Sequence, residues 1–388
     1  MRYNQSLSGD RVAGDPELRS VGDSSIKNNS NFSFRRVRLV FSGDINEYVS
    51  FYLQPDFAST SGDLNFGQLR DAYADLAFDK EHEYRIRAGQ SKVPFGWENL
   101  QSSQNRLTLD RADALNSAVP SERDLGLFAY WSPSDTQKLW KSLSKKGLKT
   151  SGDYGVLGFG VYNGQGINKP EANDDFYFVA HSSYPFELGF IGLPEQVLEV
   201  GVDAISGRFN TSSSDTCSFK DGQTASCFAY TYEGNKYGKP FVTTDGNSED
   251  RVGVHAILFP QPFGLQTEWN WGKGPTLNPL TNTVERQDLN GGYVQAMYKI
   301  DNVFGTKGTM IPYAKWQTYE GAWKGATFAP RVNVEEVEAG VEYQISKALE
   351  ITLAYATMSR TNIADPTKTD YLKQARGDLL RTQLQFNY

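Results

Sequence analysis

The sequence is poor in the residues on which many enzymes and metal sites depend. It has only two cysteines and three histidines in 388 residues. The histidines, His82, His181 and His255, are far apart, and none has a partner at the spacing of a known metal motif. Neither a phosphate-binding loop nor a G-x-S-x-G motif is present. We therefore expect no enzyme, and no metal or other cofactor.

Long hydrophobic runs and a basic excess are also missing. No stretch approaches the roughly 18 apolar residues that a membrane-spanning helix needs. Acidic residues outnumber basic ones by 46 to 39, which disfavours nucleic-acid binding because that function needs a basic face. The 13% aromatic content and the 36 glycines favour strands and turns. Such a chain suits a soluble β protein, or a membrane β-barrel in which every second strand residue faces water.

Alternation of polar and apolar residues recurs from the first residues to the last. It predicts sixteen strands, two of them in the hairpin 32–57, whose sequence is "FSFRRVRLVFSGDINEYVSFYLQPDF". The other expected strands lie at residues 1–6, 69–78, 83–90, 125–131, 154–164, 175–184, 196–206, 250–259, 264–272, 291–300, 308–319, 333–346, 349–358 and 378–388.

The connections between these segments alternate in length. Short ones such as "SGDIN", "DKEH" and "PQPF" contrast with long polar ones at residues 7–31, 91–123, 207–248, 273–288 and 359–374. Short turns at one end and long loops at the other are typical of outer-membrane barrels. The sequence therefore predicts an all-β fold in which residues 1–388 form a single domain, a 16-stranded antiparallel transmembrane β-barrel.

One connection interrupts the pattern with helical periodicity, at residues 136–149. Its lysines recur every three or four residues, at Lys138, Lys141, Lys145 and Lys149, around an apolar stripe that contains Trp140. This predicts an amphipathic helix inserted in a short turn. It suits a solvated surface helix, or one that contacts anionic headgroups or the cell wall. In either case we expect Lys149 to lie far from the narrowest part of a channel.

Cys217 and Cys227 are ten positions apart in a stretch rich in Ser, Thr, Asp and Gly. A disulfide within a loop fits an oxidising compartment, and two free thiols are the alternative. No signal peptide is recognised, and "MRYNQS" already alternates like a strand, so we expect a mature or trimmed chain.

Several stretches together resemble the phosphate-selective porin O and P family of Gram-negative bacteria. They are "FRRVRLVFSG", "LRDAYADL", "RAGQSKVPFGWENLQSS" with "NRLTLD" after it, and the closing strand with its terminal aromatic Tyr388. The resemblance implies a homotrimer of sixteen-stranded barrels in the outer membrane, among its lipids and lipopolysaccharide. It also implies that the third long loop, residues 91–123, folds into the lumen as a constriction loop.

The resemblance also assigns roles to single residues. Arg36 matches a family arginine on the second strand, Asp71 the constriction aspartate, and Arg106 the arginine of the inward loop. The family's phosphate-selective members carry a further ladder of arginines, and no such cluster occurs in 207–248. The resemblance therefore supports a porin better than it supports phosphate as the solute.

Charges on the polar strand faces indicate what a lumen would contain. Four arginines, Arg36, Arg38, Arg85 and Arg87, lie opposite apolar neighbours. On the lipid side each would cost about 2–4 kcal/mol at the bilayer midplane, so they should point inward. There a guanidinium suits phosphate and carboxylate oxygens. Alternatively the arginines pair with Asp71 and Asp75 as part of the wall, and both functions can coexist.

An acidic wall opposes this basic one. Glu336, Glu338 and Glu342 share the polar face of the segment 333–346. The expected constriction loop is nearly balanced in charge, with Lys92, Arg106 and Arg111 against Glu98, Asp110 and Asp113. We therefore expect a water-filled channel with a weak preference for small anions such as phosphate or carboxylates. The alternatives are a general or cation-preferring porin, and a closed structural or adhesin barrel.

Overall fold

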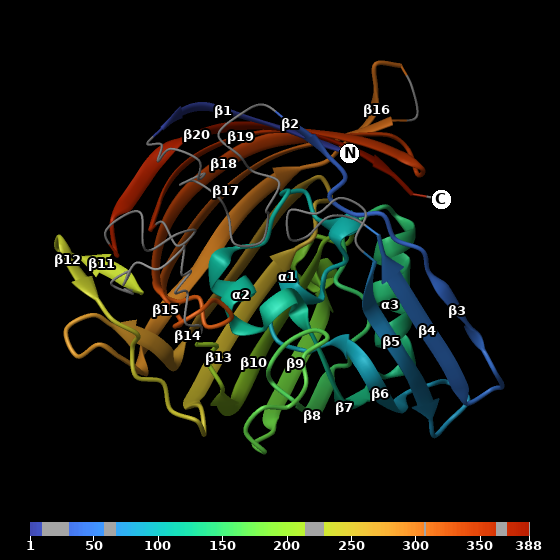
Figure 1. The fold of residues 1–388 in the computed structure, drawn as a ribbon. Helices are drawn as coiled ribbons and strands as arrows, with labels where there is room; N and C mark the ends of the chain where they lie inside the picture. The colour runs from blue at the N-terminus through green and yellow to red at the C-terminus, as the bar shows by residue number, and fades with distance from the viewer. Residues whose placement is uncertain (10–30, 58–66, 214–228, 306–307, 362–370, 388) are drawn as a thin grey trace.

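A curved antiparallel sheet makes up most of the protein (Figure 1). The computed structural model describes residues 1–9, 31–57, 67–213, 229–305, 308–361 and 371–387. Eighteen strands belong to the sheet, and the short helices α1 and α2 lie inside its curve (Figure 1). Among the described residues, every helix is too short or too polar to cross a bilayer. The predicted all-β fold is confirmed.

The strands of the sheet are β1 (Arg2–Gly9), β2 (Asn31–Ser33), β3 (Phe41–Asp44), β4 (Val49–Asp56), β5 (Gln68–Ala77), β6 (Tyr84–Lys92), β7 (Arg123–Trp131), β8 (Leu157–Tyr162), β9 (Tyr177–Glu187), β10 (Val197–Phe209), β13 (Asn247–Leu258), β14 (Phe263–Asn278), β15 (Thr283–Tyr298), β16 (Ile300–Val303), β17 (Gly308–Ala322), β18 (Arg331–Ser346), β19 (Leu349–Thr361) and β20 (Gln374–Phe386). A separate hairpin joins β11 (Tyr230–Tyr232) to β12 (Asn235–Tyr237). The helices are α1 (Trp97–Leu100), α2 (Asp113–Ala118) and α3 (Ser134–Lys145), with 3₁₀ turns at Ser103–Asn105, Pro120–Glu122 and Leu188–Ile191.

Neighbours in sequence are neighbours in the sheet. From β3 to β10 each strand pairs with the next, and the series continues through β13, β14, β15, β17, β18, β19 and β20. The first strand, β1, pairs with the last, β20, and also with β2. The chain's two ends therefore meet, and the Met1 amino group donates to the Leu384 carbonyl at 2.8 Å.

Two local expectations were wrong. The strand expected through Arg36 and Arg38 is interrupted between β2 and β3, because the Asp56 carboxylate accepts from the Val37 N–H at 3.2 Å and from Arg38, and so competes with the ladder. The loop expected at 273–288 is a continuation of the β14–β15 hairpin, whose register runs unbroken to Asn278 opposite Thr283. Buried Leu277 and Val284 supply the apolar contact that extends this hairpin.

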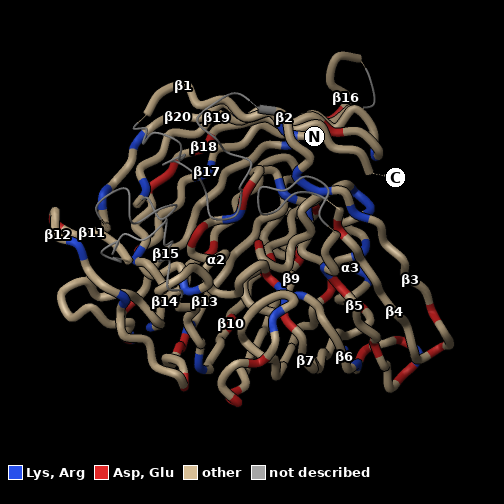
Figure 2. The backbone as a smooth tube through the Cα atoms, in the orientation of Figure 1, with Lys and Arg blue, Asp and Glu red and all other residues tan. Residues whose placement is uncertain are grey.

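Burial is inverted relative to a soluble protein. Along β6, Tyr84 and Ile86 are 54% and 37% exposed, whereas Arg85 and Arg87 are 7% and 6% exposed. The same alternation holds in β18, where Val337 is exposed and Glu338 is buried. Apolar side chains thus cover the outer face, and many charged side chains of both signs are buried on the inner face. Figure 2 marks where the charged residues lie along the backbone. This arrangement fits lipid outside and polar surroundings inside.

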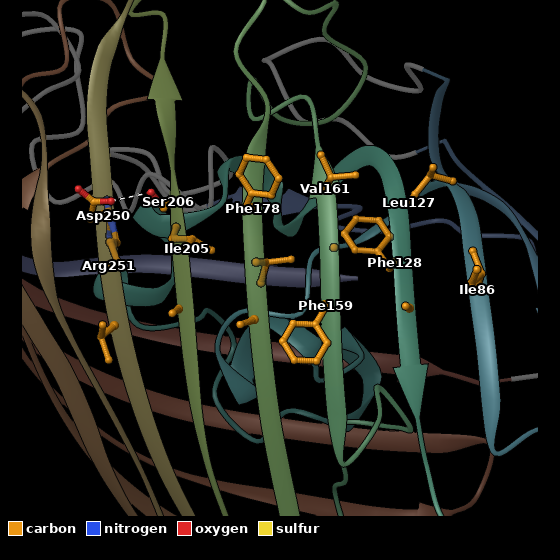
Figure 3. Close-up of a pocket in the computed structure, with 16 residues that line it drawn as sticks. Ile86, Leu127, Phe128, Phe159, Val161, Phe178, Ile205, Ser206, Asp250 and Arg251 are labelled. Atoms are coloured by element: carbon orange, nitrogen blue, oxygen red, sulfur yellow. Dashed lines mark hydrogen bonds between the residues drawn. The ribbon is translucent and has the colours of Figure 1, made fainter.

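The outer face of β6 to β13 is hollowed by a shallow apolar groove of about 720 Å³ (Figure 3). Leu127, Phe159 and Phe178 point outward beside it, on three neighbouring strands. Small residues such as Gly160 and Ala180 leave the space between these larger side chains. Such a surface would be unfavourable in water, and it supports a lipid-facing exterior.

The helix expected at 136–149 is found as α3, but its surroundings differ from the expectation. Its apolar residues Trp140 and Leu143 are buried against Trp97 of the constriction loop and Phe259 of the wall. It lies inside the curve of the sheet rather than on the outer surface (Figure 1). The contact with headgroups or the cell wall remains an untested hypothesis.

Cysteine labelling of neighbours in β4 tests which face meets lipid. Gln54 is buried beside an interior cavity and Leu53 is 39% exposed on the other face. In a background with Cys217 and Cys227 replaced by serine, Q54C in membranes should react with a small water-soluble thiol reagent, and L53C should not. Reaction of L53C alone would mean that water lies outside.

Candidate functional site

The segment 91–123 leaves the sheet after β6, crosses the interior and returns as β7. Nearly all its residues from Val93 to Val119 are buried, in α1, a 3₁₀ turn and α2. Gly96 turns the chain into α1 with a φ of 81°, and a Cβ there would come within 2.5 Å of Leu115. Only glycine fits this close, left-handed turn without strain. The segment is thus a packed loop inside the curve of the sheet, which we call the constriction loop after the role that the resemblance implies, and that role remains a proposal.

Wall carboxylates fasten the first half of this loop. Glu268 on β14 accepts from the backbone N–H groups of Trp97 and Glu98, both at 2.6 Å. Asp203 on β10 accepts from the Gly96 N–H at 3.0 Å. Glu98 in turn pairs with Lys315 of β17 at 2.6 Å. Charge-assisted hydrogen bonds of this kind are stronger than neutral ones, so α1 is firmly held against β10, β14 and β17.

Ion pairs fasten the second half. Asp113 pairs with Arg360 of β19 at 3.3 Å, and Arg360 also contacts Glu336 at 2.7 Å. Asp110 lies between two terminal-strand arginines, Arg2 at 3.3 Å and Arg381 at 2.7 Å. The loop that starts at β6 therefore reaches β19, β20 and β1, and it spans the interior.

Three of the four arginines predicted on the polar strand faces have acidic partners, two of them on strands and one in the segment after α3. Arg87 binds Asp75 through two hydrogen bonds, at 2.7 and 2.8 Å. Arg38 pairs with Asp56 at 2.7 Å, and Arg85 with Asp153 at 2.9 Å. The alternative that the arginines pair with carboxylates of the protein thus holds for these three. Only Arg87 pairs with an aspartate that was named from the sequence.

The predicted constriction aspartate has a partner that sequence reasoning missed. Asp71 pairs with Arg123 at 2.9 Å, and Arg123 also contacts Glu122. Arg111 pairs with the same Glu122. Arg111 lies within the constriction loop and Arg123 at its end, so their pairing with Glu122 stiffens the loop's return to β7.

Lys92 supports the loop and is fully engaged by backbone. Its ammonium donates to the carbonyls of Leu100 and Gln101, both at 2.8 Å. These are the last residues of α1 and its C-terminal cap, so the charge satisfies carbonyls that the short helix leaves open. Its predicted position at the constriction remains a proposal, and its contacts are those of a loop anchor.

Arg36 and Arg106 differ from the other arginines. Within the described part of the chain, neither guanidinium has a hydrogen-bond or ion-pair partner, and the Nε atoms of both are buried. Arg106 is 5% exposed, and burial lowers the pKa of its guanidinium. Arg36 lines an interior cavity of about 570 Å³ together with Arg38 and Gln104. The two cations are close enough to repel each other, so an anion between or beside them would be stabilised.

The predicted acidic residues all face the interior, but they do not act as one row. Glu336 is neutralised by Arg360, and Glu338 accepts from the Tyr313 hydroxyl at 2.8 Å. Glu342 pairs with Lys149 at 2.8 Å. The expectation that Lys149 lies far from the constriction was therefore wrong. The turn that carries it folds inward, and its ammonium is 3.3 Å from the Gln104 carbonyl of the loop.

Two histidines that look unrelated in the sequence meet in the interior. His181 on β9 and His255 on β13 flank Asp203 on β10, and Ser183 lies 3.0 Å from His255. The order resembles a Ser–His–Asp triad, but Ser183 donates to Glu199 at 2.7 Å and all these side chains are buried. Among the described residues, no group of three or more His, Cys, Asp or Glu side chains is arranged so that it could hold a metal ion.

This histidine cluster also contacts residues that fasten the constriction loop. The Glu199 carboxylate accepts from the indole N–H groups of Trp97, at 3.1 Å, and Trp140, at 3.2 Å. The sequence carries one indication of this cluster. Titratable residues recur at inward-facing positions of β9, β10 and β13, and this is recognised only once the register of the strands is known.

Cys217 and Cys227 lie outside the described residues, so their disulfide stays a prediction.

Comparison with known proteins agrees with this architecture. The family model described as "Phosphate-selective porin O and P" matches residues 9–388. No curated protein matches. Among solved structures, the outer membrane channel DcaP of Acinetobacter baumannii has a TM-score of 0.55 at 12% identity, covering 100% of this chain and 94% of its own. OmpT of Vibrio cholerae has a TM-score of 0.54 at 10% identity, covering 100% and 95%. At these identities the likeness to solved structures shows the fold.

The buried fastening by Arg360 predicts a large loss of stability on its removal. R360A leaves Asp113 and Glu336 buried without their counter-charge, which should cost about 3–5 kcal/mol of unfolding free energy. As a matched control, R286A removes an exposed pair with Asp250, and should cost at most about 1 kcal/mol. Equilibrium urea unfolding in lipid vesicles measures both. Equal losses of unfolding free energy in the two variants would show that the ion pairs of Arg360 stabilise the protein no more than an exposed pair does.

Proposed function

The chain belongs to the phosphate-selective porin O and P family, outer-membrane diffusion channels of Gram-negative bacteria, and on that premise we propose that its constriction favours small anions. Small hydrophilic solutes such as phosphate and carboxylates would cross passively through a water-filled lumen. The observation that carries the proposal is the pair of guanidinium groups, Arg36 and Arg106, that have no partner among the described residues.

We propose a closed barrel of sixteen strands around this lumen. In support, β2 and β3 are parts of one segment whose ends pair with β1 and β4. Likewise β15 and β16 are separated by a single residue, and both pair with β17. Counted in this way, the eighteen strands of the sheet become sixteen. The pairing of β1 with β20 favours closure, because a closed sheet leaves no free edge in lipid.

The proposed preference for anions depends on which positive charges have no carboxylate beside them. At 4 Å and an effective dielectric near 20, one unit charge attracts another by about 4 kcal/mol. Arg38, Arg85 and Arg87 are neutralised by aspartates, so their contribution to a passing ion is reduced. Arg36 and Arg106 have no such counter-charge among the described residues, and a guanidinium offers a fork of donors to phosphate or carboxylate oxygens.

A general or cation-preferring porin is the second candidate, because buried glutamates also line the interior. Two of the three predicted glutamates are paired, Glu336 with Arg360 and Glu342 with Lys149. This pairing weakens the attraction for cations and favours the anion proposal. A closed structural or adhesin barrel is the third candidate, and it differs from both in passing no stepwise current across a planar bilayer.

A homotrimer embedded among outer-membrane lipids and lipopolysaccharide is also proposed, as the family resemblance implies. The apolar outer face would be shared between neighbouring barrels and lipid. The mass of the protein–detergent complex, corrected for detergent by sedimentation or light scattering, should be three times the 43.3 kDa of one chain. A corrected mass of one chain would refute the trimer.

Selectivity is tested by the zero-current potential across a potassium chloride gradient. The wild-type protein should favour chloride, and R106A should lower the chloride-to-potassium permeability ratio several-fold, towards one. K80A removes the same charge from an exposed position in the turn between β5 and β6 and should leave the ratio nearly unchanged. A cation preference in the wild type would overturn the anion proposal, and equal effects of the two variants would remove Arg106 from the constriction.

A further inference from the structure

A second segment folds into the interior from the opposite end of the barrel. It comprises α3 and the residues that follow it up to β8, and we name residues 134–155 the α3 segment. Its apolar side is buried with Trp97 and Phe259, and Trp140 donates to Glu199, an inward-facing residue of β10. Its exposed side carries Lys138, Lys141 and Lys145. One face of the segment is thus fixed to the wall, and the other faces solvent.

The residues after α3 cross the interior to the far wall. The Lys149 ammonium is 2.8 Å from Glu342 on β18 and 3.2 Å from Glu350 on β19. Four residues later, Asp153 pairs with Arg85 on β6 at 2.9 Å and accepts from Ser132 at 2.6 Å. In the pairing order, β6 is separated from β18 by β7, β8, β9, β10, β13, β14, β15 and β17. The α3 segment therefore joins distant parts of the wall.

The crossing residues also contact the constriction loop. The Gln101 side chain donates to the Lys149 carbonyl at 2.8 Å, and the Asn105 side chain donates to the Thr150 carbonyl at 3.3 Å. A cavity of about 520 Å³ borders the segment at Lys138, Thr150 and Asp153, while Gln104 borders the arginine-lined cavity of about 570 Å³. The segment and the loop together thus form a bridge between two open spaces.

We propose that the α3 segment is a second constriction of the channel and that Lys149 is its positioning residue, which limits the size of solutes that pass. The proposal rests on the proposed diffusion function and adds a size limit to it. Lys149 faces two carboxylates at once, and both are largely buried. Without the ammonium, Glu342 and Glu350 would repel each other, and the segment would lose its ion pairs to β18 and β19. It would then move away from the far wall and widen the path.

The experiment measures the size limit directly. K149A, K149R and K80A are reconstituted into liposomes, and swelling rates are recorded with neutral sugars from a pentose to a trisaccharide. K149A should admit the trisaccharide at least twofold faster relative to the pentose than the wild type does. K149R keeps a cation in place and should restore the wild-type ratio. K80A removes an equal charge from an exposed position in the turn between β5 and β6 and should leave the ratio unchanged.

The outcomes separate this inference from the function on which it rests. If the wild type passes no sugar and no ion, the diffusion channel itself is wrong. If it conducts and K149A behaves like K80A, the second constriction is wrong. Should K149A fail to fold, judged by its heat-modifiable migration, E350Q removes one of the two ion pairs and should give a smaller increase in the same ratio. An unchanged ratio in E350Q would then overturn the proposal.

Discussion

The structure depends on one constraint, the exclusion of charge from the outer face of the sheet. Because successive side chains of a strand alternate between faces, an apolar exterior places most ionisable strand residues on the inward face. The interior then holds many charges at low exposure, each of which is costly unless it is paired. The ion pairs of Arg87 with Asp75, and of Arg360 with Asp113 and Glu336, follow from that constraint.

Internal pairing also explains how two long connections can fold inward and stay there. The constriction loop supplies backbone N–H groups and carboxylates, and the wall supplies Glu268, Asp203 and Arg360 to meet them. The α3 segment is fixed in the same way, through Glu199 at one end and through Glu342 and Glu350 at the other. The charged wall is therefore both the support of the constriction and the surface that a solute meets.

The charged residues that form no ion pair with the wall or the loop are the best candidates for a role in transport. Arg36 lies where the strand between β2 and β3 is interrupted, and Arg106 lies on the constriction loop beside Leu107, which packs against Tyr313 of β17. Residues 34–40 depart from the hydrogen-bonded ladder of the sheet. The space that results within the sheet's curve is the cavity that these residues line. A local break in regular structure thus coincides with the candidate anion site.

The sequence by itself determined most of the strands and their inward and outward faces, because a period of two and an apolar exterior are local properties. It placed Arg85, Arg87 and Glu338 on the interior face, where the structure buries all three. Only the tertiary structure decided which charges meet. Asp71 pairs with Arg123 rather than with a strand arginine, and His181 and His255 share Asp203. Lys149 reaches Glu342 across the interior. These partners depend on register and on where loops return, and residues far apart in the chain become neighbours only when the sheet curves.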